Sequence, residues 1–530
     1  MQVYKISYDK VPQFSGRDRA YVLRHPALRS FYKYPPEWGA FGQVIADKQK
    51  EPVDRNTLVK VIWEQHKGLE VPALVAKNIE KLRNDNTFTI ITAHQPALFT
   101  GPLYYIFKII STISLTRTLG EKYPQYHFVP VFISSGEDHD FEEINHLHLF
   151  NKTLTWHHEQ KGPVGQMDTA TLRPVLDELK TILGESERAK AIFKIIEKTH
   201  TGDHPYGRAA FELAFHLFRE EGLVVVNTYD DQLKRLFAPI VKEEILSQAS
   251  KPLVEATIGR LKEAGFAPQA TPRDINFFYL GEHLRERIVW ENDAYRVLNT
   301  DLVFSKKEME QEIDAHPERF SPNVIMRPLY QELVFPNLAY VGGGGEIAYW
   351  LERKDQFEHF GINFPMLVRR DSGLWIDAAT NKKIKRVHLH VNDLWKDTDR
   401  LIREYLFKYG EVEISLQKER DSLQSIFRPL AEKAKAIDPG LEKMVLAELA
   451  KTNKSLDLIE TRLLRAEKRV HESAVRQIGR IKEKLFPGNG LQERYDNFLP
   501  FYLKYGKDFF NTLLEHFNPL DKQFKIFVEE

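Results

Sequence analysis

The most constraining feature of this sequence is a strand–loop–helix–strand pattern between residues 87 and 133. Residues 87–92 (TFTIIT) and 128–133 (FVPVFI) are short β-branched or apolar runs, which are typical of buried strands. A loop rich in His, Gln, Pro and Gly follows the first run, and residues 103–119 then have helical periodicity. Strand, helix and strand in this order predict a βαβ unit, and hence a parallel sheet with a right-handed crossover.

The same pattern of buried runs returns later in the chain and predicts an α/β core over residues 1–389. Further buried strands are predicted at 223–226, 338–341 and 366–368. Segments at about 147–205 and 267–335 do not follow the pattern. The first has His-rich extended pieces and two helices, and the second has short mixed pieces. We interpret both as insertions into the core.

The C-terminal part predicts a helical arm over residues 390–486. Charged helical sequence runs over 394–436 and 439–486, with a turn at Asp438-Pro439-Gly440 between the two helices. The second helix has an apolar residue every seven positions, at Leu449, Leu456, Leu463 and Val470. This heptad predicts an antiparallel coiled coil, with helices about 65 Å long at 1.5 Å per residue. An arm of that length indicates pairing with the same arm of a second subunit, and residues 487–530 are expected to pack back on the core.

Composition excludes several classes of function. The 530 residues contain 75 Lys+Arg and 75 Asp+Glu, whereas nucleic-acid-binding proteins normally carry a basic surplus, so we expect no nucleic-acid partner. The chain has no cysteine, which excludes disulfides, thiolate metal sites and a cysteine nucleophile. Neither a signal-peptide pattern nor an apolar run of 18 residues occurs. These observations predict a cytoplasmic protein without a membrane partner.

The first candidate site is the loop after the first predicted strand, residues 93–102 (AHQPALFTGP). Ligands of open α/β sheets bind beyond the carboxyl ends of the strands, where free helix amides attract anions. In this loop His94 is a candidate general acid or hydrogen-bond donor to a phosphate, and Gly101 allows the backbone to approach a ligand closely. Lys108, two turns along the following helix, adds positive charge. Further candidate binding residues are Gln95 and Thr100. The alternative is a helix-capping loop with a hydrogen-bonded histidine.

The second candidate site is an acidic cluster at residues 134–146 (SSGEDHDFEEINH), directly after the second predicted strand. Carboxylates this close repel one another and separate their pKa values, which suits a general base or a divalent cation. The candidate catalytic residues are Glu137, Asp138 and His139. The spacing matches no standard zinc pattern, so we assign no metal ligands. The alternative is a solvated acidic helix start.

The third candidate site contains four consecutive glycines within residues 340–350 (YVGGGGEIAYW). Glycines between a strand and a helix form either a backbone nest for an anion or a plain turn. The motif is neither GxGxxG nor a Walker loop. An upstream segment, 326–332 (MRPLYQE), adds a cation that could equally form a structural ion pair. The candidate binding residues are Arg327, Gln331, Gly342, Gly343, Gly344, Gly345, Glu346 and Tyr349.

Four segments together resemble the bacillithiol biosynthesis cysteine-adding enzymes, or bacillithiol synthases. They are AHQPALFTGPLYYIFKIIS, VFISSGEDHDFEEINH, MRPLYQELVFPNLAYVGGGGEIAYW and LQERYDNFLPFYLKYG. The resemblance implies a Rossmann-like nucleotidyltransferase core with connecting-peptide insertions, and a C-terminal coiled coil that forms a homodimer. It also implies a ligase that adds L-cysteine to the amine of glucosaminyl-malate. The family is similar to class I aminoacyl-tRNA synthetases, whose nucleotide-binding histidine motif would correspond to the His94 loop.

The implied reaction assigns chemistry to the candidate residues. Amide formation requires an activated carboxylate, for which ATP with Mg²⁺ is the usual means, and a base for the amine proton among Glu137, Asp138 and His139. His94 and the amides of Gly342–Gly345 would stabilise developing negative charge, and Arg327 would bind a malate carboxylate. Two other hypotheses are a different nucleotide-dependent nucleotidyltransferase-like enzyme and a non-catalytic dimeric scaffold.

Overall fold

A computed structural model of the chain describes residues 1–410 and 414–530, which form two compact units. The larger unit contains Lys5–Gly373 and Glu493–Lys525. The smaller unit contains Met1–Tyr4, Leu374–Gln492 and Ile526–Glu530. The segment Glu493–Lys525 therefore belongs to the same unit as the α/β core, although more than a hundred residues separate them in the sequence.

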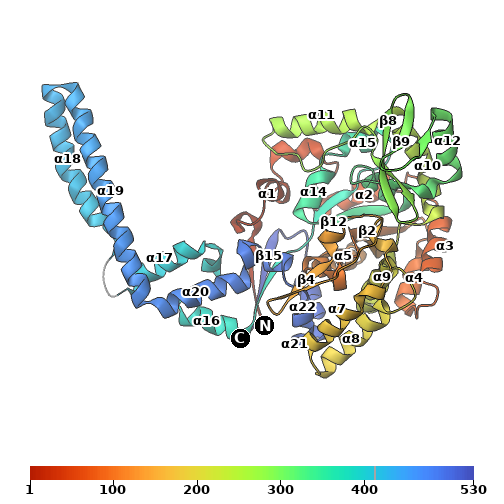
Figure 1. Cartoon of the computed structure of the whole chain (residues 1–530), viewed down its shortest axis with the longest axis horizontal. Coiled ribbons are helices and arrows are strands. Elements are labelled where there is room, and N and C mark those ends of the chain that lie inside the picture. Colours follow the sequence, from red (N-terminus) through yellow and green to blue (C-terminus); the bar gives the residue numbers. More distant parts are fainter. Residues whose placement is uncertain (411–413) are drawn as a thin grey trace. The chain divides into compact units, whose positions relative to one another are not determined.

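The larger unit is built on a five-stranded parallel sheet in the order β13-β12-β2-β3-β6. Its strands β2 and β12 are labelled in Figure 1. Its strands are β2 (Thr87–His94), β3 (His127–Ser134), β6 (Val224–Val226), β12 (Asn337–Gly342) and β13 (Met366–Arg369). The predicted βαβ unit is confirmed, because helix α5 (Tyr104–Lys122) connects β2 to β3. Most residues of these strands and of α5 are buried, which explains their continuous apolar runs.

The strand order creates a topological switch point between β2 and β12. From β2 the chain proceeds through β3 and β6 on one side, and later places β12 and β13 on the other side. The strands end at one level, because His94 pairs with Ser134 in the register and the Thr92 hydroxyl donates to the Val341 carbonyl at 2.7 Å. Open α/β sheets bind their ligands in the crevice at such a point.

The two segments that we interpret as insertions contain their own sheets. Residues 147–205 include the hairpin β4 (His146–Leu149) and β5 (Lys152–Thr155) and the helices α7 (Arg173–Leu183) and α8 (Glu187–His200). Residues 267–335 contain a five-stranded antiparallel sheet in the order β10-β9-β8-β7-β11, where the sequence predicted only short mixed pieces. Its strands are β7 (Phe277–Gly281), β8 (Leu284–Glu291), β9 (Ala294–Val297), β10 (Val303–Phe304) and β11 (Phe320–Pro322).

The remaining elements surround these sheets. The other helices of the larger unit are α1 (Gly16–Val22), α2 (Phe41–Lys48), α3 (Arg55–Gln65), α4 (Ala73–Lys81), α6 (Phe141–Ile144), α9 (Tyr206–Phe218), α10 (Asp231–Ser247), α11 (Ser250–Glu263), α12 (Lys306–Ala315), α13 (Arg327–Val334), α14 (Gly344–Trp350), α15 (Lys354–His359), α21 (Leu499–Tyr505) and α22 (Lys507–His516). A three-stranded sheet has the order β1 (Gln2–Ser7), β15 (Gln523–Val528), β14 (Gly373–Ile376).

The smaller unit contains the predicted helical hairpin, in which α18 and α19 lie side by side (Figure 1). Its helices are α16 (Ala378–Arg386), α17 (Thr398–Tyr409), α18 (Gln417–Ile437), α19 (Pro439–Val470) and α20 (Glu472–Leu485). Asp438 caps α19 by accepting from the Gly440 amide at 2.6 Å, as predicted.

The two long helices expected in this unit are interrupted. The helix predicted over 439–486 breaks at His471 (φ −98°, ψ 27°), because α20 packs on α16 and α17 instead of continuing the hairpin. The helix predicted over 394–436 is divided into α17 and α18, and residues 411–413 between them lie outside the described residues. Across residues 1–410 and 414–530, no helix has the length and apolar character needed to cross a bilayer.

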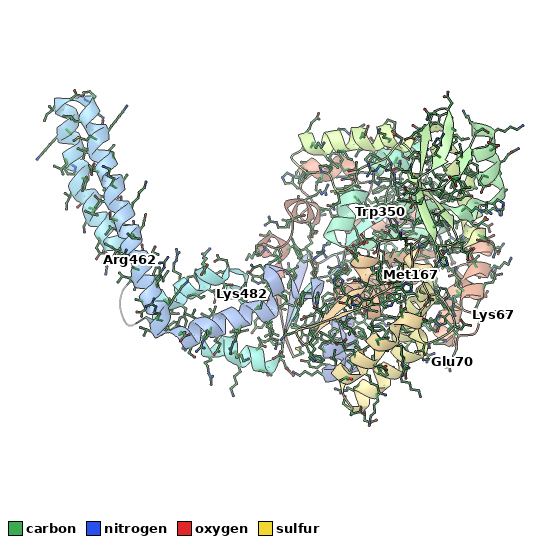
Figure 2. The ribbon with its side chains drawn as sticks, in the orientation of Figure 1. Lys67, Glu70, Met167, Trp350, Arg462 and Lys482 are labelled. Carbon is green, nitrogen blue, oxygen red and sulfur yellow. The ribbon has the colours of Figure 1, made fainter. Side chains whose placement is uncertain are left out.

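The solvent exposure of side chains differs between the two units. Trp350 on α14 is fully buried in the larger unit, whereas Arg462 on α19 is exposed (Figure 2). Apolar side chains of the hairpin are exposed as well: Ile426 to 56%, Ile437 to 80% and Ile459 to 47%. The hairpin therefore carries apolar surface that its own two helices do not cover.

Candidate active site

A cavity of about 440 Å³ opens at the switch point, and all three predicted segments contribute to its wall. The predicted residues that line it are His94, Gln95, Asp138, Arg327, Gly343, Gly345, Glu346 and Tyr349. The predicted residues outside its lining are Thr100, Gly101, Lys108, Glu137, His139, Gln331, Gly342 and Gly344. Segments near residues 95, 138 and 344 thus meet at one place, although half of the predicted side chains support the wall rather than form it.

His94 is a neutral side chain in this cavity. Its Nδ1 lies 2.9 Å from the Gln95 carbonyl oxygen, and its Nε2 lies 3.2 Å from the Tyr104 hydroxyl. A carbonyl oxygen only accepts, so Nδ1 carries the proton and Nε2 accepts from Tyr104. Burial and the nearby Lys108 cation lower the pKa of His94 to about 4. At neutral pH the ring is therefore uncharged, donates through Nδ1 and accepts through Nε2. The role of His94 as a general acid stays a prediction.

The buried Lys108 forms an ion pair with Glu346, a carboxylate on the cavity wall. Its Nζ lies 2.8 Å from Glu346 Oε1 and also donates to the Ala93 carbonyl. Glu346 additionally accepts from the Tyr340 hydroxyl at 2.5 Å and from the Gly343 amide at 2.8 Å. Burial opposes the charge on Glu346, but Lys108 and these donors outweigh it and lower the pKa of Glu346 to about 2. The positive charge expected for a ligand is thus already neutralised, and the pair joins α5 to α14.

The predicted anion nest at the four glycines does not form. Gly342 ends β12, Gly343 caps α14, and Gly344 and Gly345 lie in the first turn of that helix. None of the four has a positive φ, and the Gly343 amide donates to Glu346 rather than to open space. A larger residue does not fit at Gly344, because a Cβ there would lie 2.2 Å from Asp18 Oδ2. The Asp18 side chain cannot easily move away, since Arg369 donates to it at 3.2 Å.

The space around the α-carbon differs between Gly344 and Gly345, and this difference predicts different effects of alanine substitution on stability. We expect Gly344→Ala to lower the free energy of unfolding by about 1–3 kcal/mol, because it overpacks against Asp18. Gly345→Ala has no atom within 4 Å of the new Cβ and is expected to be neutral, or stabilising by up to about 1 kcal/mol, through helix propensity. Urea unfolding of the two variants measures the difference. Equal midpoints would contradict the close approach of Asp18.

Within the acidic cluster, only Asp138 of the three predicted catalytic residues lines the cavity. It accepts from Gln95 Nε2 at 2.6 Å, and Arg285 Nη1 lies 3.4 Å from its Oδ1. Glu137 is instead paired with the buried Lys234 at 2.6 Å. His139 accepts through Nδ1 from Arg285 at 2.7 Å. The cluster therefore contributes one structural ion pair, that of Glu137, and two carboxylates at the cavity, those of Asp138 and Glu143.

Four arginines line the cavity: Arg285, Arg327, Arg370 and Arg494. Arg327 donates to the Tyr349 hydroxyl at 2.6 Å, and Arg370 forms a buried ion pair with Glu493 at 2.7 Å. Of these four, only Arg327 is among the residues predicted from the sequence. Arg370 follows the last strand of the sheet, which was a usable signal, whereas Arg285 and Arg494 reach the site through tertiary folding.

The turn at the end of β2 has an unusual backbone that the C-terminal segment stabilises. Phe99, Thr100 and Gly101 have φ values of 43°, 74° and 61°. Positive φ is unfavourable for Phe and Thr, and a Cβ on Gly101 would lie 2.9 Å from Ala97 Cβ. Asn497 donates to the carbonyls of Phe99 at 3.1 Å and Gly101 at 2.6 Å. Thr100 and Gly101 thus shape the turn instead of lining the cavity.

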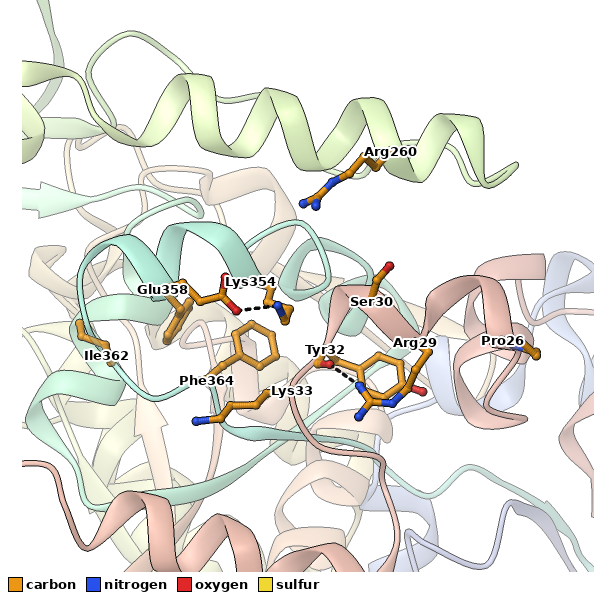
Figure 3. Close-up of a pocket in the computed structure, with 11 residues that line it drawn as sticks. Pro26, Arg29, Ser30, Tyr32, Lys33, Arg260, Lys354, Glu358, Ile362 and Phe364 are labelled. Atoms are coloured by element: carbon orange, nitrogen blue, oxygen red, sulfur yellow. Dashed lines mark hydrogen bonds and ion pairs between the residues drawn. The ribbon is translucent and has the colours of Figure 1, made fainter.

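A larger cavity of about 780 Å³ lies elsewhere in this unit and contains no predicted site residue (Figure 3). Its cations are already engaged: Lys354 pairs with Glu358 at 2.6 Å, and Arg29 donates to the Tyr32 carbonyl at 2.9 Å. We place the active site in the smaller cavity because its polar groups converge at the strand ends. Within the described ranges of the chain, no group of three His, Asp or Glu side chains is arranged to hold a metal ion.

Comparison with known proteins agrees with this architecture. The parallel sheet with its cavity at the switch point is that of a Rossmann-like domain, and residues 1–371 match the family model "Bacillithiol biosynthesis BshC, N-terminal Rossmann-like domain". Residues 373–529 match "Bacillithiol biosynthesis BshC, C-terminal coiled-coil domain". The chain belongs to the bacillithiol biosynthesis BshC family.

Its relatives include bacterial proteins named "Putative cysteine ligase BshC". The protein of Flavobacterium johnsoniae is 41% identical over 523 residues, which cover 98% of both chains. That of Flavobacterium psychrophilum is 39% identical with the same coverage, and that of Bacillus anthracis is 29% identical over 97% of both chains. The resemblance noted in the sequence is thus confirmed at the level of the family.

Proposed function

We propose that this protein is a ligase that joins L-cysteine to the amine of glucosaminyl-malate, and that the 440 Å³ cavity is its active site. The observation that carries the proposal is the wall of this cavity, where four arginines meet three carboxylates at the strand ends of a BshC-family core. Arginine forks suit carboxylate and phosphate groups, and both substrates carry carboxylates. We also place the reaction in the cytoplasm, where small biosynthetic substrates are made.

The reaction forms a C–N bond between the cysteine carboxyl carbon and the glucosaminyl nitrogen. A free carboxylate does not react with an amine in water, so we propose that ATP first transfers a phosphoryl or nucleotidyl group to a carboxylate oxygen. The amine then attacks, the activated oxygen leaves with the transferred group, and the nitrogen loses a proton. Asp138 is the base that we assign to that proton, because it is the only one of the three candidate bases on the cavity wall.

The test is product formation by the purified protein. We expect incubation with L-cysteine, glucosaminyl-malate and ATP to yield a product with the mass of the two substrates less one water. Omitting ATP tests the activating group separately from the substrates. No product with folded protein would contradict the proposal, and would favour either a nucleotidyltransferase-like enzyme with other substrates or a scaffold.

We propose further that the core is a relative of nucleotidyltransferases with two connecting-peptide insertions, and that α18 and α19 form an antiparallel coiled coil that makes a homodimer. Exposed apolar residues on the hairpin support a second copy as the partner, among them Leu430, Ile459, Leu463 and Val470. Arg420 already links the two helices through Asp457 and Glu460, each at 2.8 Å. The uncovered apolar side chains are therefore available to another chain.

Charge substitution on this surface is expected to abolish the dimer. Ile459→Asp with Leu463→Asp places carboxylates where the interface would be apolar, so we expect a monomer by light scattering where the unaltered protein is a dimer. Lys451→Asp with Lys454→Asp adds the same two carboxylates at exposed polar positions of α19 and serves as the control. A dimer that persists in the Ile459/Leu463 variant would contradict this interface.

A further inference from the structure

A second, smaller cavity adjoins the active-site cavity and shares a wall with it. It has a volume of about 80 Å³. The side chains common to both linings are His94, Gln95, Tyr104, Glu143 and Arg494. At roughly 10–15 Å³ per water-sized position, this volume holds about six such positions, close to the number of non-hydrogen atoms in L-cysteine. The cavity is therefore too small for a nucleotide or a sugar, and suits a small amino acid.

Two opposite charges on the shared wall have no ion-pair partner in the described parts of the chain. Arg494 lies with its guanidinium carbon 5.6 Å from the centre of the Tyr104 ring, and its neighbour Glu493 is the residue that pairs with Arg370. Glu143 is exposed at the surface side of this wall and accepts from the Gln95 amide, and partial burial together with the carboxylates of Asp140 and Asp138 raises the pKa of Glu143. Most other charged residues at the active-site cavity are already paired: Arg285 with Asp138, Arg370 with Glu493, and Glu346 with Lys108.

Arg494 is an exposed residue whose two chain neighbours are anchored. Glu493 is buried and accepts from Arg370, Ser372 and the Gly373 amide, the last at 2.9 Å. On the other side of Arg494, Tyr495 stacks on His148 with ring centres 3.9 Å apart. The backbone that carries Arg494 is thus fixed on both sides, which keeps the base of this side chain at the shared wall.

The rest of the small cavity is apolar with a polar rim. Ala97, Pro102, Ile144 and Leu147 form the apolar part, and the imidazoles of His146 and His148 complete it. Burial and the neighbouring His146 lower the pKa of His148, so its ring is neutral and offers no charge to the end of a ligand's side chain. Such a surface suits a short, weakly polar side chain such as a thiol.

We infer that this small cavity is the amino-acid subsite, in which Arg494 binds the α-carboxylate and Glu143 binds the α-ammonium of L-cysteine. The inference rests on the proposed function and specifies how one substrate is held. Because Arg494 lies on the shared wall, the carboxylate bound there faces the larger cavity, where activation and attack by the amine take place. The thiol lies in the apolar part, away from the reacting carbon.

Ligands that lack one charged group test each contact separately. Cysteamine has no carboxylate, and 3-mercaptopropionate has no ammonium. We expect Arg494→Met to weaken L-cysteine binding about ten- to a hundredfold and to leave cysteamine binding unchanged. Glu143→Gln is expected to weaken L-cysteine similarly and to leave 3-mercaptopropionate unchanged. Calorimetric titration of the full chain, with glucosaminyl-malate present and ATP absent, measures the dissociation constants of L-cysteine and of both analogues.

Matched controls are Arg235→Met on α10 and Glu142→Gln beside Glu143, both exposed and outside the two cavities. Equal weakening of L-cysteine and its truncated analogue by either variant would overturn the inference, as would no measurable L-cysteine binding by the unaltered protein. Normal product formation with unaffected binding in the variants would remove the subsite and keep the proposed function. The expected binding pattern without product formation would remove the function and keep an amino-acid site.

Discussion

Replacing Lys108 by Met is expected to lower the free energy of unfolding by about 3–5 kcal/mol. The Lys108 side chain is 1% exposed and lies 2.8 Å from Glu346, whose side chain is 25% exposed at the cavity, so the substitution leaves a largely buried carboxylate without its cation. The Ala93 carbonyl loses a donor in the same change. Urea unfolding of the larger unit, followed through the aromatic signal of its core, measures the loss.

Two further variants separate the buried charge from the lost side chain. Lys108→Met combined with Glu346→Gln is expected to recover part of the stability, because no net charge remains buried. Lys354→Met removes a pair with Glu358 in which the side chains are 24% and 62% exposed, and should cost less than about 1 kcal/mol. A Lys108→Met protein as stable as Lys354→Met would mean that the ion pair does not support the wall of the site.

Asp138→Asn is expected to lower kcat for cysteine addition by about 10²–10⁴, the usual contribution of a general base. The amide keeps the shape of the side chain and can still interact with Gln95, whose Nε2 lies 2.6 Å from Asp138 Oδ2, but it cannot accept the amine proton. KM for the two substrates and the urea midpoint should change little. Steady-state kinetics followed by product mass measures the effect.

Glu142→Gln is the matched control, since Glu142 is exposed in the same cluster and outside the cavity. It should retain nearly full activity. An equal loss in both variants would indicate that the charge of the cluster matters rather than one base. Full activity of Asp138→Asn would remove Asp138 from the mechanism and leave the base to be sought elsewhere.

The sheet and the position of the site could be predicted from the sequence because they depend on local patterns. Apolar runs at 87–92 and 128–133 with a helix between them define two neighbouring parallel strands, and the loops after them must meet at one edge. Even the glycine run was placed correctly at a strand end.

What each side chain does at that edge could not be predicted, because it depends on partners distant in sequence. Lys108 is neutralised by Glu346, and Glu137 by Lys234. Arg494 reaches the cavity because its segment folds with the α/β core after the helical arm has intervened. Neither periodicity nor local spacing in the sequence indicates such pairings. The residues predicted from the sequence therefore include both side chains that face the cavity and side chains that support its wall.

A structure of the protein with glucosaminyl-malate bound is the most direct measurement of where the reaction takes place. We predict the ligand in the 440 Å³ cavity, with malate carboxylates on the arginines of its wall and the amine directed toward Asp138 and the entrance of the smaller cavity. Density for the ligand in the 780 Å³ cavity of Figure 3, with the switch-point cavity empty, would contradict this assignment.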